Sequence, residues 1–322
     1  MSSVLSAKHF HDEQAAYDWV EARLWPNGPV CPRCKGTERV SLMGGQSTRI
    51  GTYKCYACRK PFTVKVGTVF ESSHIPMHIW LQAIHLMAAS KKGFSTQQFA
   101  RTLGVSLKSA WFLSHRIREA MKDDGAIFGG GGGPDGKANI VEADETYFGQ
   151  NPEVPFNRTP IRNMNAVMTL VDRSTGRARS VVMSELNSSK ILEIFRENVA
   201  REARLYTDDA QHYKPVGKEQ AGHETVAHAR GEFYKAGDAT IHTQTVENYY
   251  SVFKRGMRGT YQHCARKHLH RYCAEFDFRY SNRIALGVAD HERADRLLKG
   301  AVGKRLTYRA ADSGRPGQEA LA

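Results

Sequence analysis

The chain has 322 residues, 41% of them hydrophobic, and its 46 lysines and arginines against 33 aspartates and glutamates give a formal net charge of +13. This length predicts two or three compact domains, and the hydrophobic content excludes a disordered chain. The charge favours nucleic acid as a partner, although a ribosome-associated or membrane-surface protein has the same balance. No apolar run approaches the length of a membrane span and no signal-peptide core is present, so we expect a cytoplasmic protein.

The sequence of residues 1–29 predicts a short amphipathic helix, and the sequence of residues 30–70 predicts a zinc ribbon. The ribbon is indicated by two Cys-x-x-Cys pairs with strand-like segments between and after them: Cys31, Cys34, Cys55 and Cys58. Paired cysteines at this spacing in a cytosolic protein are typical of one tetrahedral Zn²⁺ rather than of disulfides. The metal would supply most of the folding free energy of so small a domain.

Residues 74–124 predict a helical, DNA-binding region that resembles a helix-turn-helix. Gly104 lies at the expected turn, and Ser106 can cap the second helix. That second helix carries basic side chains suited to a DNA groove and its phosphates: Lys108, His115, Arg116 and Arg118. A plain helical hairpin between two domains is the alternative.

A glycine run within residues 125–138 predicts a flexible linker and the main domain boundary. Residues 139–295 then predict three strands, a helix, a strand, a helical turn, a strand and a helix, which is the order of a ribonuclease-H-like α/β domain. Residues 296–322 are polar and contain glycine and proline, so we expect a C-terminal tail that frays.

Three acidic residues of the α/β region are candidate metal ligands. Asp144 lies within the hydrophobic, β-branched run Ile140–Phe148, where a buried carboxylate is costly unless a cation or hydrogen bonds compensate it. Asp208 ends a second predicted strand, and Glu247 lies on a predicted helix. Two acids on strands and one on a helix can converge on divalent cations and support a two-metal displacement at phosphorus. Taken alone, three acids among 33 mean little.

In combination, the motifs resemble one family, the insertion-sequence transposases of the IS1595 group with an N-terminal zinc ribbon and an ISXO2-like catalytic domain. The motifs that carry the resemblance are the cysteine pairs, Val141–Tyr147, Tyr206–Asp208 and His242–Glu247. It implies a DDE-type, ribonuclease-H-like core that cleaves DNA at terminal inverted repeats and joins the 3′-hydroxyl to target DNA. The implied cofactors are two Mg²⁺ or Mn²⁺ ions per active site. The implied partner is double-stranded DNA, bound by a homo-oligomer in the nucleoid of a bacterial cytoplasm.

On this chain the resemblance implies that Asp144, Asp208 and Glu247 form the catalytic, metal-binding triad. Lys254, seven residues after Glu247 and on the same helix face, resembles the basic residue that binds a phosphate of the element end, with Arg255 beside it.

Neighbouring residues leave an alternative for each of the three positions. Glu145 follows Asp144 and Asp209 follows Asp208, and only one of each pair can face the site because side chains alternate along a strand. Asn248 can replace Glu247 as the third ligand, but a carboxylate is the better ligand for Mg²⁺. Two other functions also fit the sequence. One is a zinc-ribbon DNA-binding protein with an inert second domain, and the other is a ribonuclease-H-like nuclease that cuts without joining.

Overall fold

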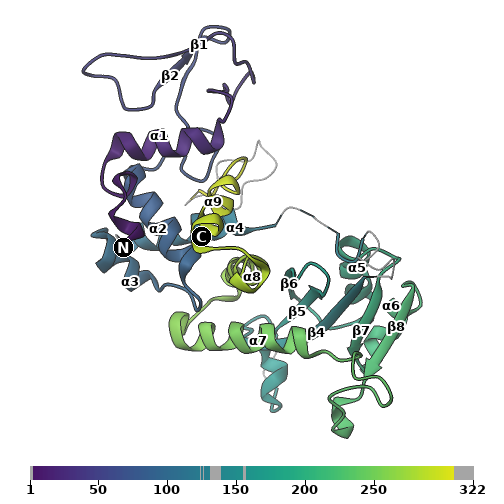
Figure 1. The fold of residues 1–322 in the computed structure, drawn as a ribbon. Helices are drawn as coiled ribbons and strands as arrows, with labels where there is room; N and C mark the ends of the chain where they lie inside the picture. Colours follow the sequence, from purple (N-terminus) through teal and green to yellow (C-terminus); the bar gives the residue numbers. More distant parts are fainter. Residues whose placement is uncertain (1–2, 124, 126, 131–138, 155–156, 308–322) are drawn as a thin grey trace. The chain divides into compact units, whose positions relative to one another are not determined.

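The computed structural model (Figure 1) describes the chain over residues 3–123, 125, 127–130, 139–154 and 157–307. It divides into two compact units, one from residues 1–122 and 288–322 and the other from residues 123–287, each over its described part. Most of the predicted glycine linker and most of the predicted tail lie outside the described residues. Among the helices that the structure describes, none is long and apolar enough to cross a membrane.

The helices of the first unit are α1 (Glu13–Leu24), α2 (Met77–Ala89), α3 (Thr96–Leu103), α4 (Leu107–Met121) and α9 (Asp290–Lys299). The carboxylate of Asp12 caps α1 by accepting the Ala15 N–H at 2.7 Å. Helix α9 packs on α2 and buries Leu297 and Leu298 completely. This apolar face is the reason that α9 lies in the first unit, whereas the predicted catalytic domain extends to residue 295.

The turn between α3 and α4 has the local structure that the sequence predicts. Gly104 adopts a left-handed conformation with φ of 64°, which glycine tolerates without strain. Ser95 caps α3 by accepting the Gln98 N–H, and Ser106 caps α4 by accepting the Ser109 N–H, both at 3.2 Å. The predicted turn and cap are confirmed, and contact of this region with DNA stays a prediction.

The zinc-ribbon region contains one small antiparallel sheet with the strands in chain order: β1 (Val40–Leu42), β2 (Tyr53–Cys55) and β3 (Pro61–Phe62). Its cluster of buried residues consists of Cys31, Cys55 and Phe62, with a few half-buried side chains against them. So small a cluster supplies little hydrophobic stabilisation. The ribbon therefore needs another source of folding free energy.

The second unit contains a five-stranded mixed sheet in the order β6-β5-β4-β7-β8. Its strands are β4 (Ile140–Gln150), β5 (Met164–Asp172), β6 (Ala178–Met183), β7 (Arg204–Asp208) and β8 (Gly222–Val226). Strands β4, β5 and β6 pair antiparallel, while β7 and β8 run parallel to β4 and to each other. Helix α5 (Ser188–Asn198) precedes β7, and the short α6 (Lys214–Gly217) precedes β8. The predicted ribonuclease-H-like α/β fold is confirmed.

Alternation along the central strands places helices on both faces of this sheet. On one face, Val141 and Ala143 of β4 pack in one hydrophobic cluster with α5. On the other face, Phe148 of β4 and Val167 of β5 pack against α7 (Gln244–Gly256) and α8 (Arg266–Ser281). Figure 1 shows α7 beside the central strands. Residues two apart on β4 therefore lie on the same face of the sheet. This position determines which helices each acid of the strand can contact.

Candidate active site and zinc centre

The four cysteines of the two predicted pairs lie together in the ribbon. Their sulfur atoms are all within 4.8 Å of one another, with 3.7 Å between Sγ of Cys31 and Cys58 and 3.5 Å between Sγ of Cys34 and Cys55. A disulfide has an S–S distance of about 2.05 Å. Four Zn–S bonds of about 2.3 Å in a tetrahedron place the sulfurs about 3.8 Å apart. The set therefore fits one structural Zn²⁺.

The acids of β4 divide between the two faces of the sheet. Glu142 and Asp144 lie on the face covered by α7, because they alternate with Val141 and Ala143. Glu145 lies on the opposite face, where its Oε1 is 3.0 Å from Nε2 of His212. The expectation that Asp144 and Glu145 point in opposite directions is confirmed.

Asp144 has the electrostatic environment of a metal ligand. Burial is the largest cause that raises its pKa, to about 7. The negative charges of Glu145, the next residue in the chain, and of Asp208 and Glu247 raise the pKa further, so Asp208 and Glu247 lie in the neighbourhood of Asp144. Within the described residues, only the four cysteines bring three or more ligand atoms within 4.8 Å of one another, so the three acids are spaced more widely.

Asp208 lies at the C-terminal end of β7, next to β4 in the sheet. Its Oδ1 accepts the Ala210 N–H at 3.1 Å, and burial, followed by the charge of Glu145, raises its pKa. Asp209 is exposed to solvent. Asp208 is half-buried and its charge raises the pKa of Asp144, whereas Asp209 is exposed, and the choice of Asp208 as the ligand stays a prediction.

Glu247 lies in the first turn of α7 and is 45% exposed at its side chain. Its Oε1 lies 3.2 Å from Nε2 of His228 and accepts a hydrogen bond from the Thr243 hydroxyl at 3.2 Å. Asn248 is also exposed, so exposure does not distinguish it from Glu247 as a ligand. The charge of Glu247 raises the pKa of Asp144, so Glu247 lies near it, and the choice of Glu247 over Asn248 stays a prediction.

The start of α7 is held on β4 by Glu142, whose importance the sequence analysis did not recognise. This carboxylate is completely buried and accepts the Val246 N–H at 2.9 Å and the Thr245 hydroxyl at 2.6 Å. It also pairs with the Arg173 guanidinium, which donates to the His242 carbonyl at 2.7 Å. An acid two residues before Asp144, and therefore on its face, was the available signal.

A second contact holds α7 on the same strand one turn later. The Tyr250 hydroxyl donates to the backbone carbonyl of Asp144, and its ring is buried. Nζ of Lys254 lies 5.9 Å from the centre of that ring, which places Lys254 on the α7 face above β4. Arg255 is exposed, and its Nε donates to the Ser251 carbonyl. The two contacts to β4 fix the position of Glu247 relative to Asp144.

The burial of Arg116 argues against the predicted contact with DNA. Arg116 is buried, and its guanidinium donates to the carbonyls of Val69 and Glu71, each at 2.8 Å, and of Leu306 at 3.0 Å. Burial lowers its pKa to about 10. The side chains of His115 and Arg118 are buried as well, whereas Lys108 is exposed on the first turn of α4.

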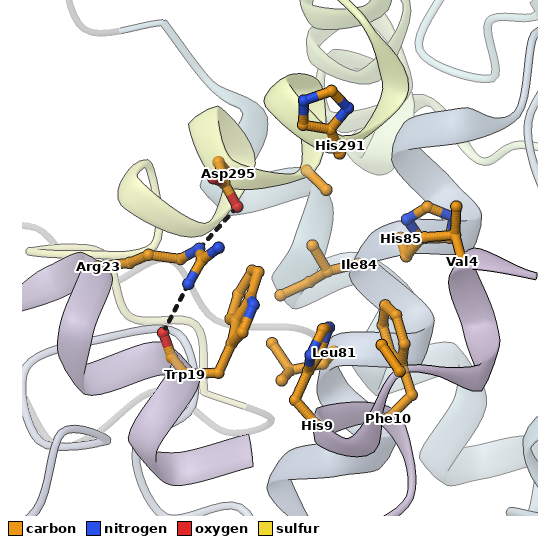
Figure 2. A pocket seen from close by; sticks show the side chains of 12 residues that line it. Val4, His9, Phe10, Trp19, Arg23, Leu81, Ile84, His85, His291 and Asp295 are labelled. Atoms are coloured by element: carbon orange, nitrogen blue, oxygen red, sulfur yellow. Dashed lines mark hydrogen bonds and ion pairs between the residues drawn. The ribbon is translucent and has the colours of Figure 1, made fainter. Parts of the chain in front are cut away.

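Figure 2 shows a cavity of about 180 Å³ in the first unit, and none of the residues that line it is a predicted site residue. Apolar side chains such as Leu81 and Ile84 line it, and the ion pair of Arg23 with Asp295 lies at its edge. Small-molecule sites usually have about 300–1,000 Å³. Its size and its lining do not make it an active site.

Comparisons with known proteins identify the family of each of the two domains. Residues 136–281 match the model of the ISXO2-like transposase domain, and residues 11–61 match the model of the transposase zinc-ribbon domain. The chain is 25% identical over 267 residues to a protein in the transposable element ISH50 of Halobacterium salinarum, with 78% of this chain and 85% of that protein covered. This relative comes from an archaeon, so it gives no support to the bacterial source that we expected.

Two solved structures match parts of this chain at low similarity. The HTLV-2 integrase catalytic core domain in complex with magnesium is 12% identical, with 41% of this chain and 71% of that chain covered and a TM-score of 0.24. The Mos1 strand transfer complex is 13% identical, with 64% and 77% covered and a TM-score of 0.18. At such TM-scores the likeness carries no residue-level information. On the two family matches, the chain is a transposase of an insertion sequence, with a zinc-ribbon domain and an ISXO2-like catalytic domain of the DDE type.

Proposed function

We propose that this transposase cleaves DNA at the terminal inverted repeats of its element and joins the freed 3′-hydroxyl to target DNA. Asp144, Asp208 and Glu247 would hold two Mg²⁺ or Mn²⁺ ions. The observation that carries the proposal is the half-buried Asp144 with two further acids in its neighbourhood and a pKa of about 7. Carboxylates held together in this way are destabilising unless cations compensate them.

A site that holds two ions does not require the three acids to meet at one point. Ions in two-metal sites lie about 3.5–4 Å apart, so their ligands need not surround a single point. Bound there, the metals would activate the attacking oxygen and stabilise the leaving one.

The part of the protein itself is to position the groups. Helix α7 carries both Glu247 and Lys254, and its contacts through Glu142 and Tyr250 hold it on the strand of Asp144. Lys254 is suited to bind a phosphate of the element end beside the metals. Phosphoryl transfer needs alignment and charge stabilisation more than covalent help, so this rigid arrangement is what the reaction requires.

The remaining parts of the chain would recognise DNA. We assign recognition of the terminal repeats to the zinc ribbon and to α3–α4, where Lys108 is exposed, and contact with the DNA backbone to Arg255. Both ends of an element must be cut together, so we expect the protein to act as a homo-oligomer on DNA.

The test is strand transfer in vitro with Mg²⁺ or Mn²⁺ and labelled DNA that ends in the element's own repeats. Asp144→Ala, Asp208→Ala and Glu247→Ala should each lose at least about a thousandfold of cutting and joining, because each removes a ligand of the reacting centre. Asp209→Ala is the matched control, since Asp209 is an exposed acid adjacent to Asp208. Cutting without joined products would favour a nuclease, and binding without any metal-dependent cutting would refute the catalytic assignment.

A further inference from the structure

The loop between β8 and α7, residues 227–241, presents two adjacent aromatic side chains to solvent. Phe233 is 65% exposed and Tyr234 is 47% exposed. Within the described part of the chain, Phe233 is the one phenylalanine among the exposed large hydrophobic residues. Exposed apolar rings are unfavourable in water, and two together at a loop indicate a binding surface. We call residues 227–241 the aromatic loop.

Hydrogen bonds within the aromatic loop hold it in a defined shape. The Glu232 carboxylate accepts the Ala227 N–H at 3.2 Å, and the Lys235 N–H donates to the Ile241 carbonyl at 3.0 Å. Arg173, which also pairs with Glu142, donates to the carbonyl of Thr240 at 2.7 Å. The exposed rings are therefore presented by an ordered segment that is tied to the same arginine as α7.

Both ends of the aromatic loop adjoin the candidate active site, and Figure 1 shows the loop in green between β8 and α7. At its start, Nε2 of His228 lies 3.2 Å from Oε1 of Glu247. At its end, His242 follows Ile241, and the Tyr234 ring lies edge-on to the His242 ring with 6.1 Å between their centres. DNA bound at Glu247 would meet this loop.

The charges of the aromatic loop argue against a phosphate as its ligand. Arg230 and Lys235 are balanced by Glu232 and Asp238. Lys235 pairs with Glu224. What the loop offers instead is the face of an aromatic ring, which binds the face of a nucleobase by stacking. A base can reach such a ring only after it has left its pair, and the bases beside a cleaved phosphate are the ones in reach.

We propose that Phe233, supported by Tyr234, stacks on an unpaired base next to the phosphate at which the DNA is cut or joined. The inference rests on the proposed function, because that base belongs to the DNA that the triad would process. Its ligand is thus a single-stranded nucleotide at the end of a duplex, bound without a strong preference for sequence.

The experiment compares cutting of a fully paired element end with cutting of the same end carrying a mismatch beside the cleavage site. Phe233→Ala should cut the paired end about tenfold more slowly, the effect expected from loss of one base–aromatic stack. The mismatch should restore its rate to within about twofold of the wild type, since the base is then already unpaired. Phe233→Trp should retain the wild-type rate. Ile284→Ala, an exposed apolar residue of the same unit, is the matched control and should have no effect on either substrate.

A second measurement does not require the DNA to be cut. With Ca²⁺ in place of Mg²⁺ and 2-aminopurine beside the cleavage site, binding of the wild type should change the fluorescence, and binding of Phe233→Ala should not. Wild-type cutting of the paired end by Phe233→Ala, or an equal loss on both substrates, would overturn the proposal. So would a change in oligomeric state without loss of the fluorescence signal, which would assign the rings to a second copy of the chain. If the wild type cuts neither substrate, the proposed function fails, and the fluorescence still decides whether the base is bound.

Discussion

The zinc ribbon and the candidate active site both depend on metal-binding side chains, but the fold provides those side chains in opposite ways. The ribbon's cysteines lie in two turns of a domain with only three residues in its buried cluster. Asp144 and Glu247 lie on a strand and a helix that a buried hydrophobic cluster holds together. The metal should therefore create the fold in the ribbon, whereas in the catalytic unit the fold exists first and the metal serves the chemistry.

The strongest consequence of this contrast concerns the zinc ligands. Cys34→Ser should abolish zinc binding and unfold the ribbon, because structural zinc contributes about 10–16 kcal/mol in zinc-finger peptides at neutral pH. Hydrogen exchange should become fast across β1–β3 and stay slow in β4 and β5. Zinc content is measured on the same samples. Cys264→Ser, outside the ribbon, is the control and should keep one Zn²⁺. Loss of protection in β4 or β5 would show that the two folds are not independent.

The next effect concerns Glu142, which should matter for both stability and catalysis in the catalytic unit. Glu142→Ala leaves the Val246 N–H and the Arg173 guanidinium without their buried acceptor, so we expect a loss of about 3–5 kcal/mol. Cutting should also need more Mg²⁺, because Glu247 is no longer fixed relative to Asp144. Chemical denaturation and a Mg²⁺ titration of cutting measure the two effects.

The matched control for Glu142 is Glu219→Ala, which breaks a solvent-exposed pair with Arg196. That change should cost about 0–1 kcal/mol and leave the Mg²⁺ requirement unchanged. Equal effects of the two variants would mean that Glu142 does not position α7.

A smaller effect on stability should distinguish Arg116 from Lys108, two basic residues of α4. Arg116→Ala should destabilise the first unit by about 1–3 kcal/mol, because the carbonyls of Val69, Glu71 and Leu306 lose a buried donor. Lys108→Ala should leave stability unchanged and weaken DNA binding, with a shallower dependence on salt. Thermal unfolding and DNA binding at several salt concentrations test both. The reverse pattern would restore Arg116 as a DNA contact.

The smallest effect is a dependence of stability on pH that needs no metal. Burial raises the pKa of Asp277 on α8 from 3.8 to about 7, although Tyr249 and Ser180 donate hydrogen bonds to it. The folded protein then holds a proton that the unfolded chain has released, so the stabilisation is lost as pH rises from about 4 to about 7.

For one group, the slope of this loss is at most about 1.4 kcal/mol per pH unit. Denaturation of the wild type and of Asp277→Asn between pH 5 and about 8 measures it. Asp144 and Asp208 also have raised pKa values, and the difference between the two proteins isolates Asp277. Identical slopes in both proteins would contradict the assignment.

Much of the ribbon was predictable because its site is local. The spacing of Cys31 and Cys34, and of Cys55 and Cys58, fixes two turns, and thiolates have few partners other than zinc in such a pattern. The order of strands and helices in the catalytic unit was predictable for a similar reason, since runs of hydrophobic residues and helix caps are local signals. The acids at positions 144, 208 and 247 were predictable as candidates only, and their assignment as ligands is still a proposal.

The residues that sequence reasoning misjudged are those whose surroundings come from distant segments. Arg116 lies on a helix that reads as amphipathic and basic, but the carbonyls it binds belong to residues 69, 71 and 306. In the sequence, Glu142 is not distinguished from the other acids of its strand. Its role depends on hydrogen bonds that the start of α7, more than a hundred residues later, donates to it. The exposure of Phe233 likewise depends on distant segments, since none of those that the structure describes covers it.

The sequence by itself determined the chemical type of the two metal sites, since paired cysteines supply thiolate ligands and acids on strands and helices supply carboxylate ligands. The tertiary structure alone decided which cations are buried and which are exposed. It also decided which acid supports the helix of Glu247 and which face of the sheet each of the adjacent acids Asp144 and Glu145 occupies. The physical reason is that burial and hydrogen-bond partners are set by contacts between elements far apart in the chain, and no local pattern encodes those contacts.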